Sequence, residues 1–191
     1  DGVIYSKDLS TLVRYPAGRA GDYTVPEGTT IIGRYSFEGS AALTDITLPH
    51  SLLSIDVSAF RECTGLTRFT VPQSITQIRE RVFYFCENLQ TVILPDTVTL
   101  IDEHAFAECY ALEQLRLPQS LTELGEFAFY RCLSLAQLEL NTGLSVIGDY
   151  AFFESALTEV VLPESVTELG ENAFGSDSLT LIHALGDAPE T

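Results

Sequence analysis

Residues 95–117, PDTVTLIDEHAFAECYALEQLRL, contain the pattern that decides the fold. Apolar residues follow Pro95 at three, six, eleven and seventeen positions, and the stretch ends in the alternation Leu115-Arg116-Leu117. The pattern recurs seven times, and its phenylalanine always lies eleven residues after the proline position, at Phe37, Phe60, Phe83, Phe106, Phe129, Phe152 and Phe174. A fixed period of this length is typical of a solenoid, in which each coil buries its apolar face against its neighbours.

The repeat has a period of 23 residues, except that the last step is 22. The proline position passes through Pro26, Pro49, Pro72, Pro95, Pro118, Asn141 and Pro163. In the last two repeats one residue is missing just before Leu157 and Leu179. Positions within a coil are counted below from its proline position.

Each coil is expected to contain one short strand and one helical turn. The alternation at its end is that of a strand, so stacked coils should form a parallel sheet. The stretch from position eight to fourteen, such as Glu126 to Cys132, is short enough for one helical or 3₁₀ turn. Carboxylates at position eight would favour the start of such a turn, and they are Glu80, Glu103, Glu126, Asp149 and Glu171. A calcium-binding stripe is the alternative, although one carboxylate per coil supplies few of the oxygens that calcium needs.

The repeat also predicts how the chain divides. Residues 1–22 precede the first repeat and contain two strand-like stretches, Val3–Tyr5 and Thr11–Tyr15, that predict a β-hairpin. A hairpin there would cap the open end of the core. Residues 23–184 form the solenoid, and residues 185–191 form a C-terminal tail.

Charge is distributed unevenly along the 191 residues, which carry a formal net charge of −17. Residues 1–90 hold 8 basic and 10 acidic residues, whereas residues 91–191 hold 2 and 17. This balance argues against binding to nucleic acid or to an anionic membrane surface, and no apolar run is long enough to insert into a membrane. The acidic half is either a solvated surface or a docking face for a basic partner.

The cysteines and histidines give no sign of catalysis. Cys63, Cys86, Cys109 and Cys132 all fall at position fourteen, where we expect buried, reduced thiols that act as small apolar fillers. Their spacing does not fit a zinc site. The three histidines occupy different positions of the repeat, and no glycine-rich phosphate loop is present. We therefore expect no enzyme, no catalytic residue, no metal and no cofactor.

The repeat resembles the BspA-like, or Treponema-type, leucine-rich repeat, whose units follow L-P-x-S-[VIL]-T-x-I-G-x-x-A-F-x-x-C-x-x-L-x-x-[LVI]-x. The resemblance extends from Val25 to Ala184, and the opening residues 1–16 are similar to a segment that recurs between such repeats. It implies an α/β solenoid, a right-handed superhelix with short parallel strands on the concave side and 3₁₀ or short helical turns on the convex side. It also implies a secreted or surface-displayed bacterial protein, with adhesion reported for some members, and no catalytic residues.

Two surfaces are candidates for binding. Outward strand positions on the concave side would present a polar stripe that includes Thr47, Arg68, Thr70, Gln114, Arg116 and Glu139. This stripe is either a binding face or only a solvated sheet face. Positions nine and twelve flank the inward phenylalanine on the convex side and would present the aromatic residues Tyr84, Phe127, Tyr130, Tyr150 and Phe153. Outward aromatic residues that cluster are typical of interfaces.

Together these observations predict a non-catalytic, extracellular or cell-surface module of a bacterial protein, adhesin-like in function. Its partners would be proteins on host or neighbouring cells, and a monomer is expected rather than an obligate oligomer. Two alternatives remain open at this stage. The repeats could form a structural spacer or stalk within a larger surface protein, or they could bind carbohydrate.

Overall fold

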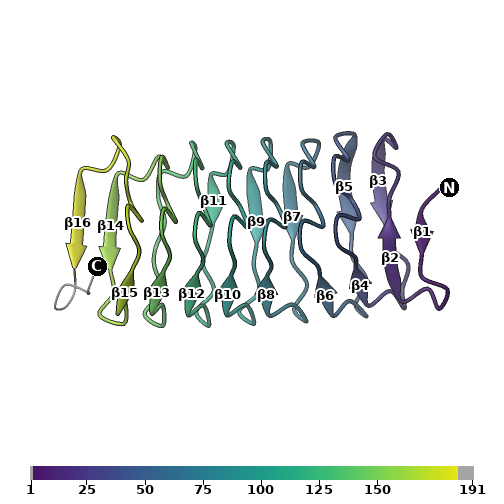
Figure 1. Ribbon diagram of the computed structural model, residues 1–191, viewed down its shortest axis with the longest axis horizontal. Coiled ribbons are helices and arrows are strands. Elements are labelled where there is room, and N and C mark those ends of the chain that lie inside the picture. The colour runs from purple at the N-terminus through teal and green to yellow at the C-terminus, as the bar shows by residue number, and fades with distance from the viewer. Residues whose placement is uncertain (1, 185–191) are drawn as a thin grey trace.

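The computed structural model describes residues 2–184, which wind into coils stacked along one axis (Figure 1). The predicted strand is present in most coils and forms what we call the strand face. Its strands are β3 (Gly21–Thr24), β5 (Leu43–Thr47), β7 (Arg68–Thr70), β9 (Thr91–Ile93), β11 (Gln114–Leu115), β14 (Glu159–Leu162) and β16 (Leu181–Ala184). Neighbours pair in parallel, so that Arg68 lies beside Thr91 and Phe69 beside Val92. The strand face is divided into three parts, β3-β5, β7-β9-β11 and β14-β16.

A second parallel ladder, which the sequence did not predict, lies at positions five and six. Its strands are β4 (Ile31–Ile32), β6 (Ser54–Ile55), β8 (Gln77–Ile78), β10 (Leu100–Ile101), β12 (Glu123–Leu124), β13 (Val146–Ile147) and β15 (Glu168–Leu169). The ladder is divided between β6 and β8, so that β4 and β6 belong to one sheet and β8, β10, β12, β13 and β15 to another. Each strand has only two residues, and the second residue points into the core, as Ile101 and Leu124 do. Such short strands leave no alternation in the sequence from which they could be predicted.

The N-terminal hairpin is formed by β1 (Ile4–Tyr5) and β2 (Thr11–Arg14), which pair antiparallel. Strand β2 also pairs in parallel with β4, so the hairpin lies at the N-terminal end of the second ladder (Figure 1). After β2, the buried ring of Tyr15 stacks on Phe37 with centroids 4.8 Å apart. The predicted tail, residues 185–191, lies outside the described residues.

The predicted helical turns, and with them the α/β class, are wrong: residues 2–184 contain strands and turns but no helix. In a helix each N–H group binds a carbonyl of its own segment. Here successive N–H groups donate alternately to the next coil and to their own coil. The N–H of Phe106 donates to the carbonyl of Ala128 in the next coil at 2.9 Å, and the N–H of Ala107 donates to the carbonyl of His104 in its own coil at 3.2 Å. Left-handed residues at positions nine and thirteen, such as His104 and Glu108, allow this alternation. We call this side of the solenoid the turn face.

The core is a row of stacked phenylalanine rings, which we call the phenylalanine spine. It comprises Phe37, Phe60, Phe83, Phe106, Phe129, Phe152 and Phe174, and neighbouring centroids are 4.9 to 5.9 Å apart. The constant spacing of eleven residues from the proline position thus places all seven rings in a single row.

The cysteines lie beside this spine as buried, free thiols, which confirms the prediction for them. Each thiol donates to the carbonyl of a phenylalanine in the preceding coil, as Cys109 Sγ does to Phe83 at 3.2 Å. Burial raises the pKa of the Cys86 thiol to about 12. These cysteines are therefore packing residues and not reactive thiolates.

Candidate interaction surfaces

The residues predicted on the concave side lie along the strand face, where all are exposed. Thr47 and Thr70 end the strands β5 and β7, and the exposed Arg68 in β7 forms an ion pair of 3.3 Å with Asp45 of the preceding coil. Gln114 lies in β11, and Arg116 follows it and binds Asp96 at 2.8 Å. The two arginines are thus paired with carboxylates of the chain itself.

The strand face is interrupted at residues 136–140, where the coil forms no strand. Glu139, the last residue of the predicted stripe, lies in this segment. A hollow of about 530 Å³ opens there, lined by residues that include Gln137, Glu139 and Thr158. The interruption comes just before the step of the repeat changes from 23 to 22 residues. The predicted stripe is therefore not one continuous sheet surface.

The five predicted aromatic residues come together on the turn face, where each is half-buried. One row is formed by residues at position nine. In it, the rings of Phe127 and Tyr150 are parallel, and their centroids are 5.1 Å apart. A second row stands at position twelve, where Tyr130 and Phe153 stack at 5.9 Å. The two rows meet edge to face, with Phe127 5.6 Å from Tyr130 and Tyr150 5.4 Å from Phe153.

The backbone explains why these rings stack in register. Phe127 and Tyr150 both have left-handed backbones, with φ of 55° and 54°, so equivalent side chains leave neighbouring coils in the same direction. His104 has the same position and the same φ of 54°, and its ring stacks on Phe127 at 4.7 Å. Tyr84 touches the edge of His104 at 6.0 Å. The aromatic patch therefore consists of Tyr84, His104, Phe127, Tyr130, Tyr150 and Phe153. His104 was not among the residues predicted for this patch from the sequence. The signal for it was that His104 lies at position nine of its coil, as Phe127 and Tyr150 do in theirs.

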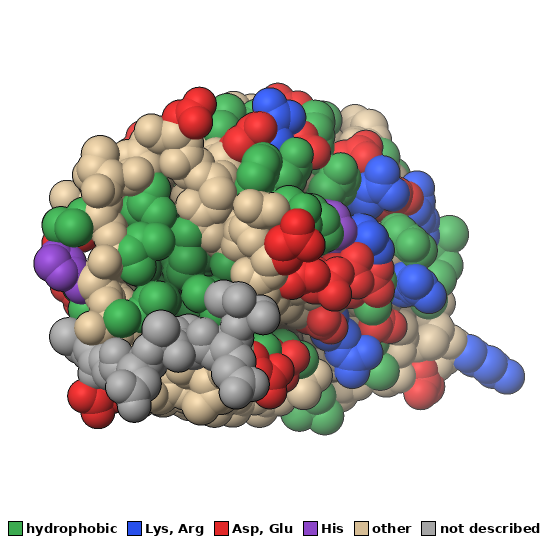
Figure 2. Space-filling view, turned by 60° about the vertical axis from the view of Figure 1, so that its left-hand side comes forward, with side chains coloured by type: hydrophobic (Ala, Val, Ile, Leu, Met, Phe, Trp, Pro, Cys, Tyr) green, Lys and Arg blue, Asp and Glu red, His purple; other side chains and the backbone are tan. Residues whose placement is uncertain are grey.

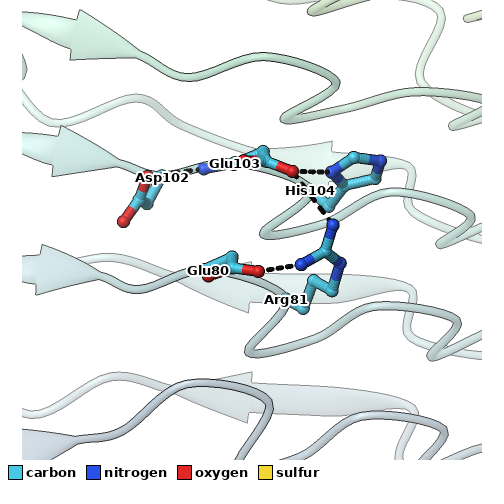
Figure 3. A network of polar contacts seen from close by, with 5 residues as sticks. All are labelled: Glu80, Arg81, Asp102, Glu103 and His104. Carbon is cyan, nitrogen blue, oxygen red and sulfur yellow. Dashed lines mark hydrogen bonds and ion pairs between the residues drawn. The ribbon is translucent and has the colours of Figure 1, made fainter.

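A network of charges borders the patch at His104 (Figure 3). Arg81 binds Glu80 of its own coil and Glu103 of the next at 2.9 Å, and Glu103 lies 3.0 Å from His104 Nδ1. Asp102 accepts the N–H of Glu103 at 2.7 Å. The position-eight carboxylates Glu80 and Glu103, which we expected at the start of helical turns, instead neutralise a cation and orient a histidine.

Burial, together with the charge of Arg81, lowers the pKa of His104, although Glu103 and Glu126 oppose this effect. The unfolded chain, in which histidine titrates near 6.5, therefore binds this proton more tightly than the folded chain does. The contribution of His104 to stability is complete above about pH 6.5 and is lost as the pH falls through that value. We expect the unfolding midpoint in urea to fall more between about pH 7.5 and pH 5.5 for the wild type than for the His104→Gln variant. Equal losses in the two proteins would show that His104 carries none of this dependence.

Residues 2–184 contain no group of three side chains that could hold a metal ion, so the calcium stripe finds no support there. The same residues form no helix capable of crossing a membrane.

The sequence was then compared with known proteins. The family model described as the BspA type leucine rich repeat region, in 6 copies, matches residues 20–122 and 76–186. The chain belongs to the BspA-type leucine-rich repeat family. Its predicted membership is thereby confirmed, and the family and its fold are generally non-catalytic. Among curated proteins, none matches this BspA-type chain.

Solved structures share the fold of this BspA-type chain. A leucine-rich repeat protein from Eubacterium ventriosum is 25% identical with a TM-score of 0.81, and the match covers 93% of this chain and 49% of that one. The Treponema pallidum leucine-rich repeat protein is 24% identical with a TM-score of 0.71, and the match covers 94% of this chain and 82% of that one. A leucine-rich cell surface protein from Faecalibacterium prausnitzii is 22% identical with a TM-score of 0.53, and the match covers 96% of this chain and 75% of that one. The chain thus spans about half the length of the Eubacterium protein.

Proposed function

We propose that this segment is a non-catalytic, protein-binding module of a bacterial surface protein, and that the aromatic patch carries the contact. The observation that supports this most is the patch itself: six rings from neighbouring coils, five of them tyrosine or phenylalanine, form one half-buried surface. Tyrosine and phenylalanine bury much area at a small cost in side-chain entropy, so they are enriched where proteins meet.

An extracellular location is part of this proposal. It is supported by membership of the BspA-type family and by the similarity of the fold to that of the Faecalibacterium cell surface protein. Host cells and neighbouring bacteria are the natural sources of partners for such a module. Their surface proteins are therefore the first targets to examine.

The test uses the fluorescently labelled segment on intact host and bacterial cells, with binding measured by flow cytometry. We expect saturable binding that is removed when surface proteins are digested with protease and retained when surface glycans are removed. The variant Tyr130→Ala/Tyr150→Ala/Phe153→Ala should lose about tenfold or more in affinity, because interface aromatics contribute about 1–2 kcal/mol or more each. The matched control is Thr47→Ala/Thr70→Ala/Gln114→Ala on the strand face, which should bind as the wild type does.

The outcomes separate the alternatives. Binding that does not saturate on any cell would favour the spacer, and binding lost with the glycans would favour carbohydrate recognition. Loss of affinity in the strand-face variant alone would move the contact to that face. Because the triple aromatic variant removes half-buried rings, its urea midpoint and circular dichroism spectrum must first be shown to be those of a folded protein.

A further inference from the structure

The turn face is hollowed next to the aromatic patch, in the last coils of the described chain. The hollow has a volume of about 660 Å³, and its lining includes Leu133, Phe153, Glu154, Ala156, Gly175 and Asp177. It coincides with the two places where a residue is missing from the repeat, before Leu157 and before Leu179. Earlier coils have one residue more at this position, so we attribute the hollow to the shortened turns. We call it the turn-face groove.

The lining of the groove combines apolar side chains with two carboxylates and three serines. Leu133 is 48% exposed, and the ring of Phe153 is held by Tyr130 at 5.9 Å. At Gly175, a Cβ atom would lie 2.7 Å from Cδ2 of Phe153, so the glycine makes room for the ring. Glu154 and Asp177 are exposed at the rim. Glu154 binds Nε of Arg131 at 2.9 Å, whereas Asp177 has no basic partner within residues 2–184.

Elsewhere on the turn face, two arginine side chains each lie over an aromatic ring and pair with a nearby carboxylate. The guanidinium group of Arg61 lies over Tyr84 at 5.6 Å from the ring centre and binds Glu62 at 2.8 Å. The guanidinium of Arg131 lies over Tyr110 at 5.8 Å and binds Glu154. In both cases a planar cation covers an aromatic ring of the turn face and pairs with a carboxylate. Arginine is suited to both contacts at once, more than lysine is.

The last arginine of the chain, Arg131, belongs to the same coil as Leu133 and pairs with Glu154 at the groove. Residues 132–184 include eight aspartates and glutamates but neither lysine nor arginine. In Figure 2, a group of carboxylates lies on the side of the solenoid, and most lysine and arginine side chains lie beyond it, farther from the C-terminal end that faces the viewer. Glu154 is thus completed by Arg131, whereas Asp177 shares the groove lining with Phe153 and has no arginine in its own or the preceding coil.

We propose that the turn-face groove binds an arginine side chain of a basic partner polypeptide, with the guanidinium over Phe153 and paired with Asp177. This inference rests on the proposed protein-binding function and specifies the chemistry of the partner. The surrounding negative charge attracts such a partner and makes its association sensitive to salt.

The test titrates the segment with a decapeptide of alternating glycine and arginine, and measures affinity by calorimetry and amide shifts by NMR. Matched peptides carry lysine or the neutral citrulline in place of arginine. We expect the arginine peptide to bind about fivefold or more tightly than the lysine peptide, to shift the amides of Phe153, Gly175 and Asp177, and to weaken with added salt. The citrulline peptide should not bind.

Two variants locate the contact. Asp177→Asn should reduce affinity for the arginine peptide about tenfold, and Phe153→Leu should remove the preference for arginine over lysine while preserving an apolar side chain. The control Glu168→Gln removes an equal charge from the exposed part of β15 and should leave affinity within about twofold. Equal effects of Asp177→Asn and Glu168→Gln, or amide shifts confined to other coils, would overturn the proposal, since they indicate attraction by net charge alone.

The two proposals can fail separately. If cells bind the wild type and the Asp177→Asn variant equally well, and the arginine peptide does not compete, the groove inference is wrong and the protein-binding function stands. If the peptide occupies the groove but no cell gives saturable binding, the adhesive function is wrong and the arginine site stands.

Discussion

Replacing Phe106 by alanine is expected to lower the free energy of unfolding by about 3–5 kcal/mol, as removal of a buried phenylalanine does in well-packed cores. Phe106 is fully buried, and its ring is stacked between Phe83 at 5.2 Å and Phe129 at 5.3 Å. Each coil contributes one ring to the spine, so the substitution removes the ring that links the two neighbouring coils. The cavity would weaken the contacts on both sides of one coil.

The shape of the unfolding curve should change as well. In a solenoid, stability is approximately a sum of terms for single coils and for the contacts between neighbours. Weakening the contacts of a central coil separates the N-terminal and C-terminal halves, so we expect the single urea transition to broaden or divide into two. Circular dichroism and tyrosine fluorescence both report on the N-terminal and the C-terminal half, so each should show the broadened or divided transition. The matched control Phe106→Leu keeps most of the apolar volume and should cost less than about 1.5 kcal/mol. A loss below about 1 kcal/mol for Phe106→Ala would contradict a stabilising role for the spine.

The second large effect is expected at Asn141, the one position where the repeat has no proline. Its buried side chain donates to the carbonyls of Pro118 and Leu121, the latter at 3.1 Å, and accepts the N–H of Gly143 at 3.0 Å. Asn141→Ala leaves these backbone groups without their partner. A buried group left unpaired costs about 1–3 kcal/mol, so we expect a loss of about 2–3 kcal/mol in urea unfolding.

The substitution Asn141→Pro provides a sharper comparison, because it restores the residue that other repeats have. If sequence pattern alone governed this position, the proline variant would be at least as stable as the wild type. The structure predicts the opposite, since proline supplies none of these three hydrogen bonds. The exposed neighbour Thr142→Ala serves as the control and should lie within about 0.5 kcal/mol of the wild type.

The period, the phenylalanine spine, most strands of the strand face and the buried cysteines could all be predicted from the amino-acid sequence. Each of these features depends only on which residues are apolar and how far apart they are. Because apolar side chains are excluded from water, their spacing is enough to predict which of them are buried. The presence of aromatic residues at positions nine and twelve was likewise evident from the sequence. The buried serine at position ten, Ser36, shows the limit of that reasoning, because it takes the place of an alanine and its hydroxyl finds no hydrogen-bond partner among residues 2–184.

The second ladder, the conformation of the turn face, the role of Asn141 and the groove beside Phe153 became evident from the three-dimensional arrangement of the coils. The first three depend on where backbone N–H and carbonyl groups find partners, many of them one coil away. The groove depends on how the shortened turns before Leu157 and Leu179 pack against each other. Because every residue except proline carries the same backbone groups, residue types alone do not distinguish a helical turn from a turn that bonds to the next coil. The same lateral bonding places His104 against Phe127 and exposes Asp177 at the rim of an unfilled hollow. The spacing of residues thus decides what is buried, and the contacts between coils decide what the surface can bind.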